Sequence, residues 1–284
     1  MGSLNGIRSN DFRLKIQGSK IIRSTSLLLL FLCAEWLGMP ITQADEARLL
    51  RFAMSAESPP SSYERNGEAR GIIRDLLEEL FVSMPEYQVE LLPLPWGRAQ
   101  LEVANGRLDG FCTFPSDTRK AYARFAAKPM YVWDYGNLVY SRDNARGKMI
   151  AQAKSFDDLR NLLFISQESV DWERENVPGF IKRYPVNTPP QMIHMLFRRG
   201  AGDFIIMSPE QARYYANQFG YTEQLRSAKV DFIPNSQVEF HIGLRKSLPD
   251  VEQVIARIDA AMLDPAFQAR REQIINQYRT ASIH

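Results

Sequence analysis

Apolar residues recur in the first half of the chain with two different periods, and their alternation predicts an α/β fold. In 72–84 the apolar positions 72, 73, 76, 77, 80 and 81 follow the period of a helix. A second helical segment, 98–105, ends before Gly106. Short apolar runs predict the strands of this region, at 49–55, 89–94 and 108–114. The order strand–helix–strand–helix–strand predicts a parallel sheet whose faces are covered by helices.

The second half of the chain repeats this pattern after a polar stretch at 142–148. We expect strands at 162–166, 204–207 and 239–244, and helices at 192–199, 209–219, 251–263 and 265–278. Extended runs at 132–141 and 230–233 lie where the chain would cross between the two halves. The sequence therefore predicts two lobes, 45–141 plus 235–284 and 142–234, joined by a two-strand hinge.

The first 44 residues have the pattern of a signal peptide. A basic start precedes a short apolar core at 27–34, and the small-residue exit Thr42-Gln43-Ala44 resembles a cleavage site. We expect cleavage near Ala44 and a periplasmic location. An uncleaved short anchor and a wrongly chosen start codon are the alternatives, because Glu35 interrupts the apolar stretch.

Charge and motif content exclude several classes of function. Five of the 35 Lys and Arg residues and two of the 33 Asp and Glu residues lie before residue 45, so cleavage changes the net charge from +2 to −1. No long basic tract remains, which argues against nucleic-acid binding. The three histidines lack metal-ligand spacing, and phosphate-loop, Gly-x-Ser-x-Gly and dinucleotide motifs are missing. We therefore predict no cofactor, and we expect Cys112 to be a buried thiol.

Residues 96–131 carry the densest group of candidate ligand-binding side chains. Trp96 opens a helix, Asp109 introduces an apolar strand that closes at Phe114, and Arg119 stands at the next helix start. In open α/β sheets, small ligands bind at the carboxyl ends of strands, beside helix N-termini. A planar guanidinium binds a carboxylate through two hydrogen bonds, a geometry that lysine cannot match. The segment thus predicts a site for a small anionic or zwitterionic molecule.

The chain resembles the extracellular solute-binding proteins of the polar amino-acid type, which are the periplasmic receptors of ABC importers. In the first half, the resemblance is carried by the Trp96-led helix, the turn Gly106-Arg107-Leu108-Asp109, the segment Ser116-Asp117-Thr118-Arg119 and the tail from Phe125 to Tyr131. In the rest of the chain, it is carried by Phe156-Asp157-Asp158-Leu159, a second turn Gly200-Ala201-Gly202-Asp203, and Ile242-Gly243-Leu244-Arg245-Lys246. The resemblance covers about residues 48–279.

This resemblance implies a periplasmic-binding-protein-like fold in which Arg119 binds the carboxylate of a ligand between two lobes. The further candidate binding residues lie at strand ends and helix starts, and they are Trp96, Arg98, Glu57, Tyr63, Phe114, Ser169 and Trp172. Core packing is the alternative role for the aromatic side chains. Solvation in a loop is the alternative for Glu57 and Tyr63, and an ion pair is the alternative for Arg98.

Ser208 stands where receptors of this type usually have an aspartate that holds the ammonium group of the ligand. A neutral hydroxyl is a weak partner for a buried ammonium, because an unpaired buried charge is expensive. Either Glu210 or Glu168 compensates, or the ligand is not an ordinary α-amino acid.

The leading hypothesis is a monomeric periplasmic binding protein that closes around a carboxylate-bearing, amino-acid-like solute. It would deliver the solute to a membrane ABC permease and perform no chemistry of its own. The second hypothesis is a periplasmic enzyme of the cyclohexadienyl-dehydratase kind, which resembles these receptors in fold and would use Glu57 or Glu168 as a general acid. The third is an orphan ligand sensor that works without a transporter.

Overall fold

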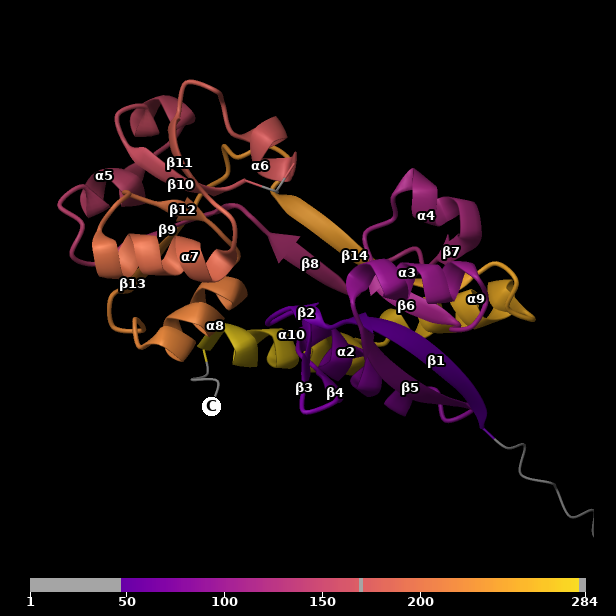
Figure 1. Cartoon of the computed structure of the whole chain (residues 1–284). Coiled ribbons are helices and arrows are strands. Elements are labelled where there is room, and N and C mark those ends of the chain that lie inside the picture. The colour runs from indigo at the N-terminus through magenta and orange to yellow at the C-terminus, as the bar shows by residue number, and fades with distance from the viewer. Residues whose placement is uncertain (1–46, 169–170, 281–284) are drawn as a thin grey trace, which may run out of the picture. The chain divides into compact units, whose positions relative to one another are not determined.

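The first sheet gathers strands from both ends of the part of the chain that the computed structural model describes, residues 47–168 and 171–280 (Figure 1). Its order is β5-β1-β6-β14-β7, and β8 pairs with β14 beside this path. The strands are β1 (Arg48–Ser55), β5 (Tyr87–Leu94), β6 (Gly110–Thr113), β7 (Ala123–Phe125), β8 (Tyr131–Asp134) and β14 (Gln237–Arg245). β1 pairs in parallel with β5 and β6, which confirms the predicted parallel arrangement. β14 returns from the second half of the chain and runs antiparallel to β6, β7 and β8.

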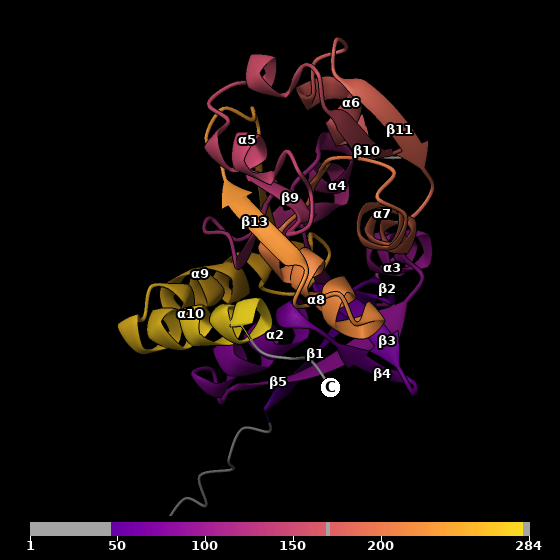
Figure 2. The same cartoon turned by 90° about the vertical axis from the view of Figure 1, so that its left-hand side faces the viewer.

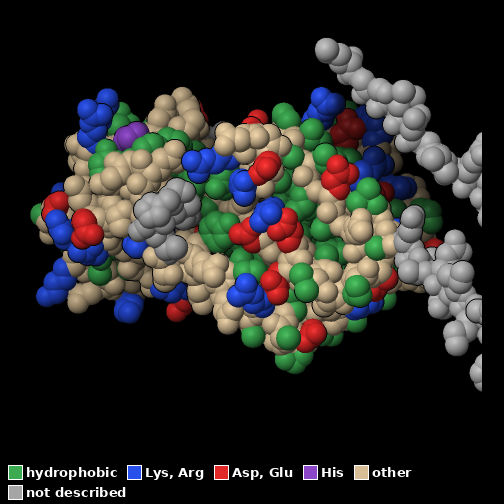
Figure 3. Space-filling view, turned by 90° about the horizontal axis from the view of Figure 1, so that it is seen from below, with side chains coloured by type: hydrophobic (Ala, Val, Ile, Leu, Met, Phe, Trp, Pro, Cys, Tyr) green, Lys and Arg blue, Asp and Glu red, His purple; other side chains and the backbone are tan. Residues whose placement is uncertain are grey.

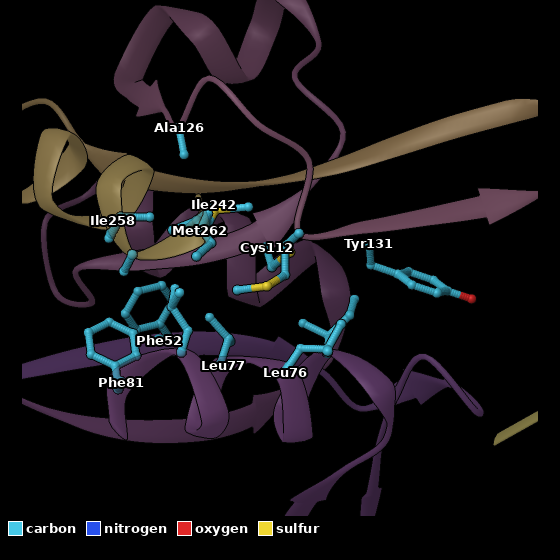
Figure 4. Close-up of a cluster of buried hydrophobic side chains, with 14 of the residues drawn as sticks. Phe52, Leu76, Leu77, Phe81, Cys112, Ala126, Tyr131, Ile242, Ile258 and Met262 are labelled. Carbon is cyan, nitrogen blue, oxygen red and sulfur yellow. The ribbon is translucent and has the colours of Figure 1, made fainter. Parts of the chain in front are cut away.

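Helices cover this sheet through the apolar positions that the sequence predicts. They are α2 (Ile72–Val82), α3 (Trp96–Ala104), α4 (Asp117–Tyr122), α9 (Val251–Met262) and α10 (Pro265–Thr280). α2 buries all six of its predicted apolar positions, from Ile72 to Phe81. Figure 4 shows Leu76, Leu77 and Phe81 of α2 pointing toward Phe52 of β1 and Cys112 of β6. The predicted α/β class is thus confirmed by a core between a mixed sheet, parallel from β5 to β6, and amphipathic helices.

A small three-stranded sheet lies between β1 and α2 in the chain. It consists of β2 (Glu57–Ser58), β3 (Ser62–Arg65) and β4 (Glu68–Arg70). The turn between β3 and β4 has φ of 56° at Asn66 and 81° at Gly67, the left-handed conformation that an Asn-Gly dipeptide adopts in a two-residue hairpin.

The second half of the chain forms two smaller sheets with their own hydrophobic clusters. β9 (Asn137–Ser141) lies between β12 (Ile205–Ile206) and β13 (Leu225–Lys229), and β10 (Leu163–Gln167) pairs in parallel with β11 (Lys182–Val186). The helices are α5 (Gly147–Gln152), the 3₁₀ turn η1 (Phe156–Leu159), α6 (Asp171–Asn176), α7 (Pro189–His194), its π-helical continuation η2 (Met195–Arg199) and α8 (Pro209–Phe219). Leu138, Phe164 and Phe204 belong to one cluster, and Val139, Ile165 and Ile205 belong to the other.

The sequence prediction missed one strand in this region. The segment 230–233 was expected to be extended and leads into the second crossing, but the strand before it, β13, ends at Lys229. The sequence Leu-Arg-Ser-Ala-Lys of β13 is half exposed at a sheet edge, so its polar residues hide it from an apolar pattern. The predicted run 132–141 is broken at Tyr135 and Gly136 into β8 and β9, which join different sheets.

The chain crosses between the two groups of sheets at two neighbouring places. β8 leads through Tyr135 and Gly136 into β9, and β13 leads through 230–236 into β14. β8 pairs with β14 in the first sheet, and β9 pairs with β13 in a sheet of the second half. Both crossings therefore connect the same two sheets. This pairing is what a two-strand hinge requires, while the division into two lobes stays a prediction.

The last helix contacts both halves of the chain. α10 packs on α2, where the Tyr278 hydroxyl donates to Asp75 at 2.7 Å. It also lies beside α8 (Figure 2). There Arg279 donates to the buried carboxylate of Glu210 at 2.6 Å. Glu210 is therefore occupied by an ion pair to α10.

Candidate functional site

The first candidate cavity lies at the carboxyl ends of three parallel strands. It has a volume of about 150 Å³ and is lined by Ser55 at the end of β1, Thr113 at the end of β6, and Phe114 just beyond. Trp96 lines it from the first turn of α3, which follows β5. Strand ends and a helix start thus meet at one edge of the sheet, as the sequence predicts.

Arg119 lies beside this cavity with only 9 % of its surface exposed. Its guanidinium lies 4.4 Å from the ring centre of Phe114 and 5.4 Å from that of Trp96. Nε donates to the Gln100 side chain at 3.0 Å and Nη1 donates to the Phe114 carbonyl at 3.1 Å. Among the described residues, no carboxylate forms an ion pair with Arg119, and burial lowers its pKa. Uncompensated positive charge is therefore held in place next to the cavity.

The two aromatic residues beside Arg119 differ in their packing and exposure. Trp96 packs edge-on against the core ring of Phe111 at 6.1 Å, so core packing and cavity lining coexist in one side chain. Phe114 is 44 % exposed, although it is a large apolar residue at the end of a buried strand. A phenyl ring left open to solvent against a guanidinium is suited to cover the apolar part of a ligand.

A second cavity, of about 250 Å³, adjoins the first. Ser58 and Trp133 line both cavities, so the two are neighbours. The second cavity brings together β2, the crossing at Tyr135, and elements of the second half of the chain. Its acid and amide side chains are Glu57, Gln167, Glu173 and Gln211, and Ser58, Tyr135 and Tyr215 add hydroxyl groups.

Glu173 is the buried acid of the second cavity, and the sequence prediction missed it. Its exposed fraction is 4 %, and Oε2 accepts the N–H of Gln167 at 2.9 Å. Burial raises the pKa of Glu173 to about 7, although the Gln167 N–H and the charge of Arg183 act in the opposite direction. The sequence signal was a carboxylate directly after Trp172, but only the packing of α6 shows that it faces inward.

Three stacked aromatic rings connect the second cavity to both chain crossings. Tyr135 stacks on Trp133 at 5.9 Å and on Trp172 at 4.3 Å. The indole Nε1 of Trp172 donates to the carbonyl of Asn235 at 2.7 Å. Trp172, predicted as a ligand residue, therefore holds one crossing against the other beside the cavity.

The other predicted site residues are dispersed. Glu57 lines the second cavity, whereas Tyr63 packs on Tyr214 at 5.8 Å and lines neither cavity described here. Arg98 is exposed, forms an ion pair with Glu102 at 3.5 Å, and likewise lines neither of them. Ser169 lies outside the described residues.

Ser208 is the N-cap of α8. It is 1 % exposed, and its hydroxyl accepts the N–H of Gln211 at 3.3 Å. Its neighbours Met207 and Gln211 line the second cavity, but Ser208 does not. The residue thus has a local reason to be serine, because a hydroxyl satisfies a free N–H at a helix start.

The two Gly-x-x-Asp turns have a structural function. Asp109 accepts the N–H of Arg51 at 2.9 Å, and Asp203 accepts the N–H of Leu163 at 2.8 Å. Both carboxylates also pair with an arginine, Arg245 for Asp109 and Arg146 for Asp203, each at 3.0 Å. The likeness of these turns therefore reflects how a strand is fixed in each half rather than ligand binding.

Several other kinds of site are missing from the described residues. No group of three or more His, Cys, Asp or Glu side chains there could hold a metal ion. Helices long and apolar enough to cross a bilayer are also lacking in this part of the chain. On the face seen in Figure 3, basic and acidic side chains lie interspersed, so this face offers no surface of a single charge.

The fold is shared with solved substrate-binding proteins of amino-acid transporters. No protein-family model and no curated protein matches the sequence. An ancestral cationic amino acid solute binding protein is 18 % identical with a TM-score of 0.63, over 82 % of this chain and 96 % of that one. The second substrate-binding domain of Lactococcus lactis GlnP, solved in an open conformation, is 16 % identical with a TM-score of 0.63, over 82 % and 96 %.

A third neighbour is the amino acid ABC transporter substrate-binding protein AbpA from Streptococcus pneumoniae, bound to L-arginine. It is 17 % identical with a TM-score of 0.56, over 83 % of this chain and 96 % of that one. At these identities the likeness shows the fold, and the periplasmic-binding-protein-like architecture predicted from the sequence is confirmed.

Proposed function

We propose that this chain is a periplasmic binding protein that captures a small, carboxylate-bearing, amino-acid-like solute between two lobes and delivers it to an ABC-type permease. The observation that carries the proposal is Arg119, a buried guanidinium without an acidic partner among the described residues. Buried charges in proteins are normally paired, because desolvation of an unpaired charge is costly. A ligand carboxylate would supply the missing charge.

The surroundings of Arg119 support a carboxylate over other anions. Two of its hydrogen bonds, to Gln100 and to the Phe114 carbonyl, fix the guanidinium against two aromatic rings. A fixed planar donor favours a planar acceptor with two oxygens. The cavity beside it is mostly apolar, so it suits the carbon skeleton of an amino acid.

Closure of the two lobes would complete the site. Side chains from both halves of the chain line the second cavity, and the two crossings run beside it. A ligand that contacts both halves binds the closed form more tightly, and it shifts the population toward that form. A permease would recognise the closed form.

The proposal is tested by a thermal-shift screen of amino acids and simple carboxylates against the full chain. A specific ligand raises the unfolding midpoint by mass action. In Arg119→Ala, we expect affinity for the best carboxylate to fall roughly 100-fold, from the loss of a charge-assisted bidentate contact. Arg124→Ala is the matched control, because Arg124 is exposed and pairs with Glu252. An unchanged affinity in Arg119→Ala would remove Arg119 from the site.

The enzyme hypothesis remains the second candidate, and one observation favours it. The pKa of Glu173 is raised to about 7 by burial, and such a carboxyl group retains a proton that a dehydratase could use. Glu57 is exposed, and Glu168 lines neither of the two cavities. The two acids predicted from the sequence are therefore less well placed than Glu173 to act as a general acid. Turnover of prephenate or arogenate by the purified chain would contradict binding without chemistry.

A further inference from the structure

The second cavity contains more negative charge than its protein surroundings neutralise. Glu173 on α6 and Glu57 on β2 both line it. No lysine or arginine among the residues described forms an ion pair with Glu173. Arg183 comes nearest in effect, but its Nη2 donates to the backbone carbonyls of Glu173 and Val177, at 3.2 and 2.6 Å. Its hydrogen bonds therefore stabilise the end of α6 rather than the carboxylate.

The burial of Glu173 makes this arrangement distinct from an acidic surface patch. At 4 % exposure the carboxyl group has lost most of its water, and the Gln167 N–H is its one hydrogen-bond donor among the contacts described. Aromatic rings of Trp133 and Tyr135 line the same cavity. A desolvated carboxylate next to aromatic faces is an arrangement that selects an organic cation.

We propose that Glu173 binds the ammonium group of the amino-acid-like ligand, with Glu57 on the wall of the same cavity. This inference rests on the proposed function, since it assumes that the ligand carboxylate is held at Arg119. It identifies the residue that takes the place of an acid at Ser208, whose hydroxyl is occupied as a helix cap. The ligand class is then a zwitterion rather than a plain carboxylic acid.

The two cavities adjoin, and each lies beside one of the two charged groups. The first adjoins Arg119 through Trp96 and Phe114, and the second contains Glu173. They meet at Ser58 and Trp133. An α-amino acid carries both charges on its α-carbon, so the proposal requires that closure bring Arg119 and Glu173, which belong to different halves of the chain, to face that carbon.

The inference also predicts a pH dependence of binding. Burial raises the pKa of Glu173 to about 7, so a fraction of the protein must release a proton before it binds an ammonium group. The groups around this carboxylate are the Gln167 N–H, Arg183, Tyr135 and Glu57. Affinity for an amino acid should therefore rise about tenfold between pH 6 and pH 8, while affinity for the matching acid without an amine should not.

The experiment is isothermal titration calorimetry on the full chain with matched pairs of probes at pH 8. The pairs are L-arginine with 5-guanidinopentanoate, L-glutamine with 4-carbamoylbutanoate, and L-phenylalanine with 3-phenylpropionate. The variants are Glu173→Gln and Glu57→Gln, with Glu175→Gln as the control, because Glu175 is an exposed glutamate of the same helix. We expect Glu173→Gln to weaken the amino acid at least tenfold and to leave its deaminated partner unchanged.

The possible failures are distinguishable. If a probe binds and Glu173→Gln weakens both members of its pair equally, the role of Glu173 is structural and the inference is wrong. It is also wrong if Glu57→Gln alone produces the selective loss. If no member of any pair binds the wild type, the proposed function itself fails and this inference fails with it.

Discussion

Replacement of Glu173 by glutamine should stabilise the ligand-free protein at neutral and alkaline pH. The pKa of this buried carboxyl group is raised from 4.5 to about 7, chiefly by burial. The folded protein therefore holds a proton that the unfolded chain releases between these two pH values. Wild-type stability relative to the glutamine variant is highest below pH 4.5, and it falls as the pH rises to about 7. Glutamine keeps the volume of the side chain and cannot ionise. The variant therefore lacks the free-energy penalty of ionising a buried carboxyl group.

The gain in stability of the glutamine variant follows from the interval between the two pKa values, 4.5 and about 7. Each pKa unit corresponds to about 1.4 kcal/mol, so the full penalty above pH 7 is roughly 3 kcal/mol. Below pH 5 it is under about 1 kcal/mol. For a chain of this size the larger figure corresponds to a rise in unfolding midpoint of up to about 10 °C. The Gln167 N–H still finds an acceptor in the glutamine carbonyl, so little stability is lost on that side.

Urea unfolding of Glu173→Gln and wild type at pH 5, 6, 7 and 8 measures this difference. Glu175→Gln is the control, since it makes the same chemical change on an exposed position of α6. A stability difference that stays constant from pH 5 to pH 8 would refute the reasoning. So would a glutamine variant that is less stable than wild type at pH 8.

Three further predictions concern the sheet beneath the first cavity. Asp109→Ala should cost about 3 kcal/mol in urea unfolding, because it leaves Arg245 without its nearly buried partner; a loss below 1 kcal/mol would contradict this. Gly110→Ala should fold poorly, since an added Cβ would lie 2.6 Å from the carbonyl of Gly243; a variant with a wild-type melting curve would show that the strands can separate at no cost. Cys112 should resist thiol reagents in the native protein and react in urea, because burial raises its pKa; rapid labelling without denaturant would show that the lining of the cavity is open.

The sequence was most informative where one face of an element is buried. The apolar positions of α2 have a clear helical period, and the Asn66-Gly67 dipeptide has the backbone freedom that a tight hairpin needs. The parallel order of the first three strands also followed from the pattern. In contrast, β13 was missed because an edge strand with exposed positions has no apolar signal.

The candidate site was only partly predictable, because its chemistry depends on which side chains face each other. Arg119, Trp96 and Phe114 lie close in sequence to one strand end, so their proximity could be inferred. Arg98 was expected beside them, but one turn of helix directs it to solvent and to Glu102. The burial of Glu173 depends on packing between α6, β10 and the crossing at Tyr135, which no local pattern records.

A structure of the protein with a bound amino acid from the calorimetric panel tests the central claim most directly. The account predicts that the ligand carboxylate lies within hydrogen-bond distance of the Arg119 guanidinium, with the side chains of Trp96 and Phe114 beside it. A ligand bound elsewhere, or one bound in this cavity with Arg119 contacting only protein atoms, would contradict it.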